Sequence, residues 1–241
     1  MIHVFADPAA AAAGLGERMV AAAHDAIAAR GTFRVALSGG ETPVTLYRLL
    51  VSPAWRERIE WRRCVLLLAD ERAVPVGDAA RTDRLVRETL LEPLGLEATA
   101  LRSMRAEAAD LDAAALEYEQ HLHEPLDLVL LGTGPDGHIA SLFPHASAVR
   151  ETGRRAVAID DSPKPPPQRI TVTPRVLAEA RAVCVLAAGE GKAAAIARAL
   201  DPRSLASDCP AALVRDGEWY IDRAAASRLG AGHSSKVRGS G

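Results

Sequence analysis

Short, wholly apolar runs alternate with helix-forming stretches along most of this chain, and that alternation constrains its fold more than any other feature. The runs at 64–69 (CVLLLA) and 128–131 (LVLL) contain no charged or hydrogen-bonding side chain other than one thiol. A strand that is apolar on both faces is typical of the interior of a parallel sheet that helices cover on each side. The sequence therefore predicts an α/β fold with a mostly parallel sheet, in which ligands bind at the carboxyl ends of the strands.

The expected elements follow from propensity, periodicity and boundary residues. We expect strands at 2–5, 33–37, 64–69, 128–131, 156–159, 170–172, 183–187 and 211–214, and helices at 8–30, 43–50, 84–92, 111–123, 174–180 and 190–200. No internal repeat or long linker separates them, so residues 1–223 are expected to form one domain. Residues 224–241 are rich in Ala, Ser and Gly and are expected to form a flexible C-terminal tail.

Composition limits the partners and the chemistry. A formal net charge of -2 gives no general attraction for nucleic acids or anionic membranes, so local donors must hold any anionic ligand. Cys64, Cys184 and Cys209 are too few and too scattered for a disulfide framework or a zinc site. No segment reaches the ~20 apolar residues of a membrane span, and no export signal begins the chain. We therefore expect a cytoplasmic protein with reduced thiols.

A glycine-rich turn between a strand and a helix reads SGGETP over residues 38–43. Two glycines let the backbone approach a ligand closely, and N–H groups at the start of a helix attract anions. The candidate phosphate-binding residues here are Ser38, Gly39, Gly40 and Thr42. A plain strand-to-helix turn is the alternative interpretation.

Charged residues follow the buried strand 64–69 directly, in the order Asp70-Glu71-Arg72. Two carboxylates and a guanidinium therefore lie where open α/β sheets place their sites. A structural ion pair would give the same pattern.

The most specific segment, at 131–144, reads LGTGPDGHIASLFP. Its three glycines and internal proline predict an irregular loop after a buried strand. Such a loop can direct Asp136 and His138 into a cleft, and an imidazole is suited to accept a proton from water at neutral pH.

Two further loops carry lysine. Lys164 precedes three prolines, which form a stiff, extended segment suited to a wall or lid, although a polyproline docking site is an alternative. Arg169 leads into the next expected strand. Lys192 ends the sequence GEGK at the start of a helix and is a second candidate phosphate ligand.

Five motifs in chain order resemble the successive signatures of the 6-phosphogluconolactonase family: SGGETP, DERAVP, LGTGPDGHIASLFPH, PKPPPQRITVT and GEGKA. That family belongs with the glucosamine-6-phosphate deaminases to one sugar-phosphate superfamily. The resemblance, from about residue 33 to 193, implies a three-layer αβα, Rossmann-like fold and no required cofactor. It also implies hydrolysis of a phosphorylated sugar lactone in the oxidative pentose phosphate pathway.

The resemblance also implies roles for individual residues. His138 corresponds to the general base, Asp136 and Asp70 to site carboxylates, and Arg72, Arg169 and Lys192 to basic residues of the substrate and phosphate pocket. The chain departs from the family at Arg81-Thr82, where relatives usually carry Ser-Asn, and at Gln168, where they often carry glutamate. One polar contact with the substrate is therefore in question.

The expected mechanism is direct hydrolysis. His138 would deprotonate a water that Asp136 or Asp70 orients, while Arg72 or backbone N–H groups would stabilise the oxyanion. No Gly-x-Ser-x-Gly elbow predicts an acyl-enzyme, and no close cluster of ligands such as HExxH predicts a metal. We expect a small-molecule substrate, no nucleic-acid or membrane partner, and a monomer or weak homodimer.

The sequence disfavours two rival functions. Aminosugar-phosphate deaminases follow DGHIA with Phe-Asn-Glu-Pro and use that glutamate, whereas this chain has Ser141-Leu142-Phe143-Pro144 there. Sugar-phosphate-sensing regulators usually add a DNA-binding domain, for which the sequence before Phe33 leaves no room. Retention of Asp136 and His138 also favours catalysis over sensing.

Overall fold

The computed structural model describes residues 1–230 and 237–239, and its centre is a parallel sheet. Among the described residues, eight strands pair in the order β11-β1-β10-β9-β6-β2-β3-β5, and every pair is parallel. The strands are β1 (Ile2–Phe5), β2 (Phe33–Leu37), β3 (Cys64–Leu68), β5 (Leu101–Arg102), β6 (Leu128–Leu131), β9 (Val183–Ala187), β10 (Glu218–Asp222) and β11 (Val237–Gly239). The predicted mostly parallel sheet is confirmed.

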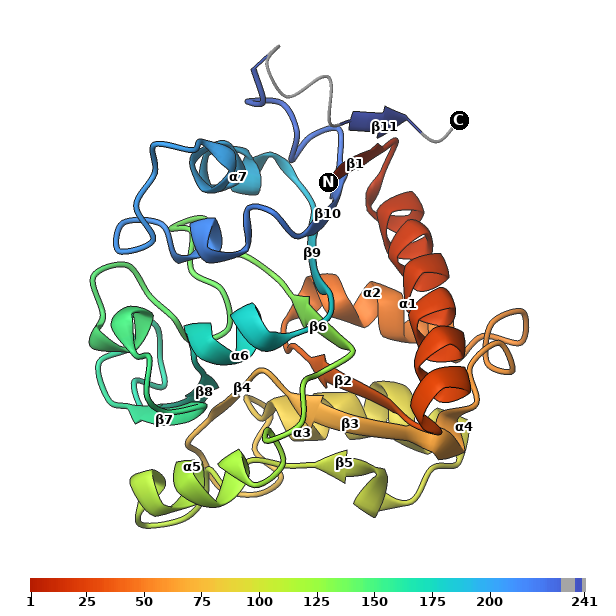
Figure 1. Cartoon of the computed structure of the whole chain (residues 1–241), viewed down its shortest axis with the longest axis vertical. Helices are drawn as coiled ribbons and strands as arrows, with labels where there is room; N and C mark the ends of the chain where they lie inside the picture. Colours follow the sequence, from red (N-terminus) through yellow and green to blue (C-terminus); the bar gives the residue numbers. More distant parts are fainter. Residues whose placement is uncertain (231–236, 240–241) are drawn as a thin grey trace.

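Helices cover both faces of this sheet. Figure 1 shows α1 (Pro8–Arg30) and α2 (Glu41–Leu50) on one side of β2, β6 and β9, with α6 (Pro174–Glu179) and α7 (Ala193–Leu200) on the other. Helix α1 packs on α2 and against β2, β9 and β10. The expected three-layer αβα architecture is therefore confirmed.

Local sequence signals fix the ends of α1. The Asp7 side chain accepts a 2.8 Å hydrogen bond from the Ala10 N–H, and Pro8 occupies the first turn, where its missing N–H has no helical partner. At the other end the Gly31 N–H donates to the Ile27 carbonyl at 2.8 Å. The observed bounds equal the predicted 8–30.

A second, three-stranded sheet lies beside the first and pairs in the order β4-β8-β7, antiparallel throughout. Its strands are β4 (Asp70–Arg72), β7 (Ala156–Ile159) and β8 (Arg169–Val172), and α5 (Leu111–Glu119) packs on β7. Ala69 joins the two sheets, because its N–H donates to Leu37 of β2 and its carbonyl accepts from Val172 of β8. The run 64–69 therefore ends one residue early and continues into a different sheet.

The prediction of a strand at 211–214 is wrong. This segment lies in a 3-10 turn (Pro210–Val214), and the strand is β10, between β1 and β9. Trp219 and Ile221 of β10 are fully buried, but the glutamate and aspartate at its ends shorten its apolar run to three residues. The two-residue strand β5 was also missed, because it is too short to show a period.

Other helical bounds differ by a few residues. The expected helix 84–92 extends over 82–94 as α3 (Thr82–Val86), a π-helical turn (Arg87–Leu91) and α4 (Glu92–Leu94), and the expected helix 111–123 ends at Glu119. The expected helix 190–200 begins as the 3-10 turn η5 (Glu190–Lys192) and continues as α7. Further 3-10 turns lie at Trp61–Arg63, Ala98–Ala100 and Ser147–Arg150.

The C-terminal segment contributes to the fold where it is described. Ala225 is fully buried in the core, and Val237–Gly239 pairs with β1. The remainder of the expected tail, 231–236 and 240–241, lies outside the described residues. Over the described part of the chain, every helix is too short or too polar to cross a bilayer. All three cysteines are buried free thiols, and burial raises the pKa of Cys64 and of Cys184 to about 12.

Candidate active site

The loops singled out in the sequence meet at one edge of the main sheet. They follow β9, β6, β2 and β3, which are neighbouring parallel strands, so their carboxyl ends lie together. In the sheet, β2 lies between β6 and β3. The chain passes from β2 to β3 on one side, and the later strands β6 and β9 lie on the other side of β2. The crevice between β2 and β6 is thus the switch point at which doubly wound sheets bind ligands.

A cavity of about 480 Å³ lies at this edge. Ten of the eleven candidate site residues line it: Ser38, Gly39, Gly40, Thr42, Asp70, Arg72, His138, Lys164, Arg169 and Lys192. The eleventh, Asp136, lies behind His138 and contacts its ring. The fold therefore brings all the candidates together from five separate segments of the chain.

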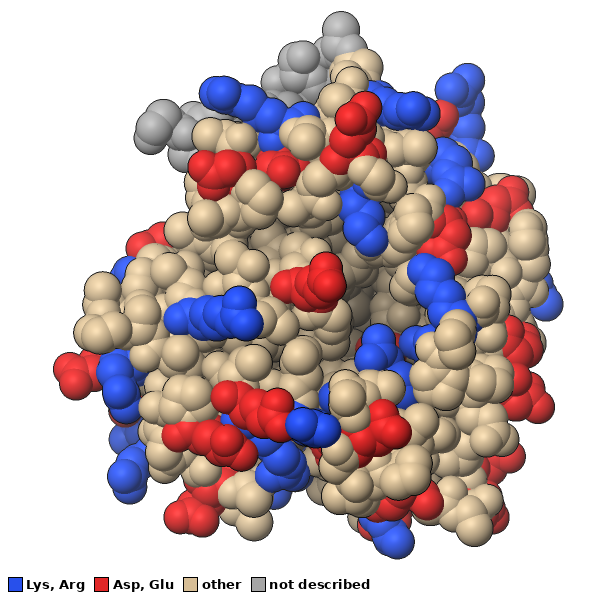
Figure 2. Space-filling view, turned by 180° about the vertical axis from the view of Figure 1, so that it is seen from behind, with Lys and Arg blue, Asp and Glu red and all other residues tan. Residues whose placement is uncertain are grey.

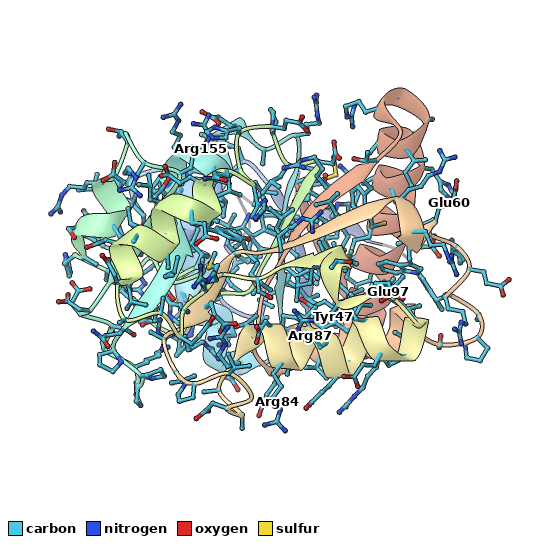
Figure 3. The ribbon with its side chains drawn as sticks, turned by 90° about the horizontal axis from the view of Figure 1, so that it is seen from below. Tyr47, Glu60, Arg84, Arg87, Glu97 and Arg155 are labelled. Carbon is cyan, nitrogen blue, oxygen red and sulfur yellow. The ribbon has the colours of Figure 1, made fainter. Side chains whose placement is uncertain are left out.

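The loop after β2 is held rigidly and leaves a helix N-terminus open. The Ser38 hydroxyl donates to the Leu130 carbonyl of β6 at 2.8 Å, and the Tyr47 hydroxyl donates to the Ser38 carbonyl at 2.7 Å. Tyr47 is fully buried and is labelled in the interior in Figure 3. Gly40 has φ +98°, and no side chain caps α2. Because the Ser38 hydroxyl is occupied, the donors that this loop leaves available for an anion are the Thr42 hydroxyl and the first backbone N–H groups of α2.

The loop after β6 carries an aspartate–histidine pair. His138 Nδ1 lies 2.6 Å from Asp136 Oδ1. Partial burial tends to raise the pKa of Asp136, but the hydrogen bond and charge of His138, together with Lys164, hold that pKa below its ordinary value. Asp136 is therefore an ionised carboxylate that can only accept hydrogen bonds. In the neutral His138 ring, the proton is accordingly on Nδ1. Nε2 of His138 has no partner among the described residues and is the ring nitrogen available as a base.

Gly134 makes room for this pair. A Cβ at this position would overlap both the His138 ring and the Asp136 carboxylate. The Gly134 N–H donates to the His138 carbonyl at 3.0 Å, and the Gly137 N–H donates to the Gly134 carbonyl at 3.0 Å, which closes the loop. On its other side the His138 ring packs against Phe143, with 4.8 Å between ring centroids.

Lys164 places a positive charge beside the pair. Its Nζ lies 3.3 Å from His138 Nδ1 and 3.7 Å from Asp136 Oδ1. Arg169 holds the Lys164 segment, because its Nη2 donates to the Lys164 carbonyl at 3.0 Å and its Nε to the Pro166 carbonyl at 3.1 Å. Arg169 is only 4% exposed. Although Arg169 lines the cavity, most of its donors are bound to the protein.

Asp70 and Arg72 come from β4, which pairs with β8, so Arg72 lies beside Arg169. The Ser141 hydroxyl donates to Asp70 Oδ2 at 2.6 Å, and both side chains are buried. Arg72 Nη1 donates to the Ala80 carbonyl at 2.7 Å, and its Nε has no hydrogen-bond partner among the described residues. Ser141 was not among the candidates, because its partner lies 71 residues away in sequence.

Lys192 lies free at the end of η5. It has no hydrogen-bond or ion-pair partner among the described residues. Burial, and then the charge of Lys164, lower its pKa, while Asp136 opposes that shift. The loop that carries Lys192 is bound by Asp222, another residue that the sequence analysis missed. The available signal is an acidic residue after the buried run Trp219-Tyr220-Ile221, but the sequence pattern predicts the strand at 211–214 instead.

The unusual pair Arg81-Thr82 lies inside the protein. The Arg81 side chain is 1% exposed and pairs with Asp83 at 3.0 Å, Glu107 at 3.0 Å and Glu71 at 3.4 Å. Burial raises the pKa of Glu71 to about 7, although backbone N–H groups and Arg81 oppose this shift. Arg81 is therefore the centre of a buried ion-pair network. Thr82 Oγ1 is buried next to Gly39 and has no hydrogen-bond partner in the part of the chain that the structure describes.

Charge elsewhere on the molecule is mixed. Figure 2 shows Lys and Arg interspersed with Asp and Glu around a central hollow of the face opposite to that in Figure 1.

Within residues 1–230 and 237–239, no group of three His, Cys, Asp or Glu side chains could hold a metal ion.

Comparisons with known proteins agree over nearly the whole chain. A family model described as glucosamine-6-phosphate isomerases/6-phosphogluconolactonase matches residues 6–221. The 6-phosphogluconolactonase of Mycobacterium tuberculosis is 41% identical over 245 residues, covering 95% of this chain and 98% of the relative. Crystallised 6-phosphogluconolactonase of Shewanella baltica matches with a TM-score of 0.78 and 28% identity, covering 92% of this chain and 96% of that one. The 6-phosphogluconolactonase structure from Trypanosoma cruzi gives a TM-score of 0.82 and 25% identity, covering 95% and 96%.

Proposed function

The chain belongs to the glucosamine-6-phosphate isomerase/6-phosphogluconolactonase family, and from that membership we propose that it hydrolyses 6-phospho-D-glucono-1,5-lactone to 6-phospho-D-gluconate. This reaction is a step of the oxidative pentose phosphate pathway. The observation that carries the proposal is the 2.6 Å Asp136–His138 pair at a cavity that also contains an unpaired lysine. A base and an anion site therefore share one cavity.

The phosphate binds to Lys192 and to the N–H groups that begin α2. Lys192 is unpaired and partly desolvated, so it gains more from a dianion than an exposed lysine would. Glu41 and Thr42, which begin α2, line the same cavity, and the helix dipole adds a partial positive charge there. Recognition of the phosphate is thus local, as the small net charge requires.

The hydrolysis proceeds by general-base catalysis. His138 Nε2 takes a proton from water as the water oxygen attacks C1 of the lactone. Asp136 stabilises the resulting imidazolium through Nδ1, in the manner of the aspartate in hydrolase triads. The bond between C1 and the ring oxygen then breaks, and His138 returns the proton to that oxygen. The product acid loses a proton to solvent.

The oxyanion at C1 requires donors. Arg72 and residues of the glycine-rich loops line the cavity, so the Arg72 guanidinium and backbone N–H groups of these loops can supply them. Asp70, held by Ser141, is available to bind substrate hydroxyls. We assign Lys164 to the charge balance around the Asp136–His138 pair. None of these roles requires a cofactor or a metal. We also propose that the enzyme is cytoplasmic and that it is a monomer or weak homodimer.

Deamination of an aminosugar phosphate is disfavoured. Phe143 occupies the position of the deaminase glutamate, and its ring packs against His138, with the Arg169 guanidinium 5.5 Å from its centroid. A carboxylate is therefore replaced by an apolar surface.

The decisive experiment is a coupled assay that generates the lactone enzymatically and compares its hydrolysis with the spontaneous reaction. We expect acceleration at micromolar enzyme or below, retained after dialysis against EDTA. Glucono-1,5-lactone without phosphate should be a poor substrate, and glucosamine-6-phosphate should not react. An unchanged rate of lactone hydrolysis would refute the proposed activity.

A further inference from the structure

Asp222 binds the loop that carries Lys192. Its Oδ1 and Oδ2 accept hydrogen bonds from the Gly189 N–H at 3.0 and 3.2 Å, and its Oδ1 also accepts from the Ala225 N–H at 2.8 Å. The residue is 5% exposed and lies at the carboxyl end of β10, which pairs with β9. A buried carboxylate therefore spans from one strand end to the loop after the neighbouring strand.

This contact fixes the backbone position from which the Lys192 side chain extends. The Gly189 carbonyl accepts from the Lys192 N–H at 3.1 Å and so closes the turn η5, after which α7 starts at Ala193. The orientation of the Gly189 peptide therefore sets the start of the turn, and Lys192 is its last residue. Among the described residues no side chain forms a hydrogen bond or ion pair with Lys192, so the backbone of the turn is the main restraint on its position.

We propose that Asp222 is a positioning residue for substrate binding, which holds Lys192 in place for the phosphate through the Gly189 turn. This inference rests on the proposed function, in which Lys192 binds the phosphate. Asp222 does not line the cavity, and its carboxylate is occupied by two backbone N–H groups. It therefore acts on the lysine through geometry, without touching the substrate.

Asp127 offers a control of equal burial, and its carboxylate also pairs with Arg30 and Arg181. It is also 5% exposed, and its carboxylate also accepts a backbone hydrogen bond, from the Arg34 N–H at 2.8 Å. It lies before β6, at the amino end of the strands and away from the cavity. Loss of either aspartate should lower stability, but only loss of Asp222 should weaken phosphate binding.

The test combines Asp222→Ala, Asp127→Ala, Lys192→Ala and the double variant Asp222→Ala/Lys192→Ala. For each protein, Tm, kcat and KM are measured with the phosphorylated lactone, and the Kd of 6-phosphogluconate is measured by calorimetry. We expect Asp222→Ala to raise KM and Kd about tenfold, the usual scale for weakening one charge-assisted contact, with kcat nearly unchanged. In the Lys192→Ala background the same substitution should change neither constant, and Asp127→Ala should lower only Tm.

Asp222→Asn retains the Oδ1 acceptor for both N–H groups and should restore most of the affinity. If Asp222→Ala does not fold, the same cycle is run with Asp222→Asn, where a smaller loss must again depend on Lys192. An equal loss of affinity with and without Lys192, or from Asp127→Ala as well, would overturn the inference. Binding of 6-phosphogluconate is measured without turnover, so absence of lactonase activity would refute the proposed function separately.

Discussion

His138 Nδ1 and Asp136 Oδ1 lie 2.6 Å apart, and this contact determines which ring nitrogen faces the chemistry. The proton on Nδ1 is directed to the carboxylate, so the ring can accept a proton only at Nε2. The sequence left open whether Asp136 or Asp70 orients the water. In the structure Asp136 contacts the histidine ring itself.

Removing the base should affect turnover more than folding. His138→Asn retains hydrogen-bonding capacity but cannot act as a base at neutral pH, so kcat should fall about 10²–10⁴-fold, or roughly 3–5 kcal/mol of barrier. Asp136→Asn should reduce kcat over a similar range by disturbing the tautomer. The Kd of 6-phosphogluconate should stay within about twofold for both. A stable His138→Asn protein with near-normal kcat would exclude the general-base role.

The glycine at position 134 should be needed for geometry. An alanine Cβ there overlaps the His138 ring and the Asp136 carboxylate, so the pair must move. A displacement of about 1 Å can cost ~10² in rate, and we expect Gly134→Ala to lower kcat by at least that factor. At Gly132, in the same loop, a Cβ would meet only the Leu186 carbonyl, at 4.0 Å. Steady-state kinetics should therefore show a far smaller loss for Gly132→Ala, and equal losses would contradict this explanation.

Phosphate affinity should fall at alkaline pH. Burial and Lys164 lower the pKa of Lys192 below the ordinary 10.5, so Lys192 loses its charge at a lower pH than an exposed lysine. Affinity is complete below that lowered pKa and declines as pH rises through it. Above pH ~8 the phosphate monoester stays a dianion. Changes in the calorimetric Kd of 6-phosphogluconate from pH 8 to 10.5 therefore report the titration of the protein and not that of the ligand. Lys192→Arg should flatten this decline, and an unchanged slope would show that Lys192 does not hold the phosphate.

Breaking the buried ion-pair network should destabilise the protein. Arg81→Met leaves Glu71, Asp83 and Glu107 without their common partner, and loss of one member of a buried network costs about 3–5 kcal/mol. Arg84 is the control, because it extends from α3 into solvent and pairs only with exposed groups (Figure 3). Urea denaturation should show a clear loss of unfolding free energy for Arg81→Met and none for Arg84→Ala. Equal urea midpoints for Arg81→Met and the unsubstituted protein would indicate that the network contributes little to stability.

Several features of the fold could be predicted because their signals are local. The ends of α1 follow from Asp7, Pro8 and Gly31, which act on N–H and carbonyl groups within one turn. The interior strand β6 follows from four successive apolar residues. The loops after these strands could be identified for the same reason, since glycine and proline act on their own backbone.

The sequence by itself determined the α/β class, most strand and helix positions, and the residue types available at the strand ends. Only the tertiary structure decided that β4, β7 and β8 form a separate antiparallel sheet, that Ser141 binds Asp70, and that Asp222 holds Gly189. The partners lie 71 residues apart in Ser141–Asp70 and 33 residues apart in Asp222–Gly189. No local window of sequence contains both partners, and the direction of a side chain depends on how the two segments pack. The chemistry of the candidate site was therefore readable from composition and order, while the division of roles required the fold.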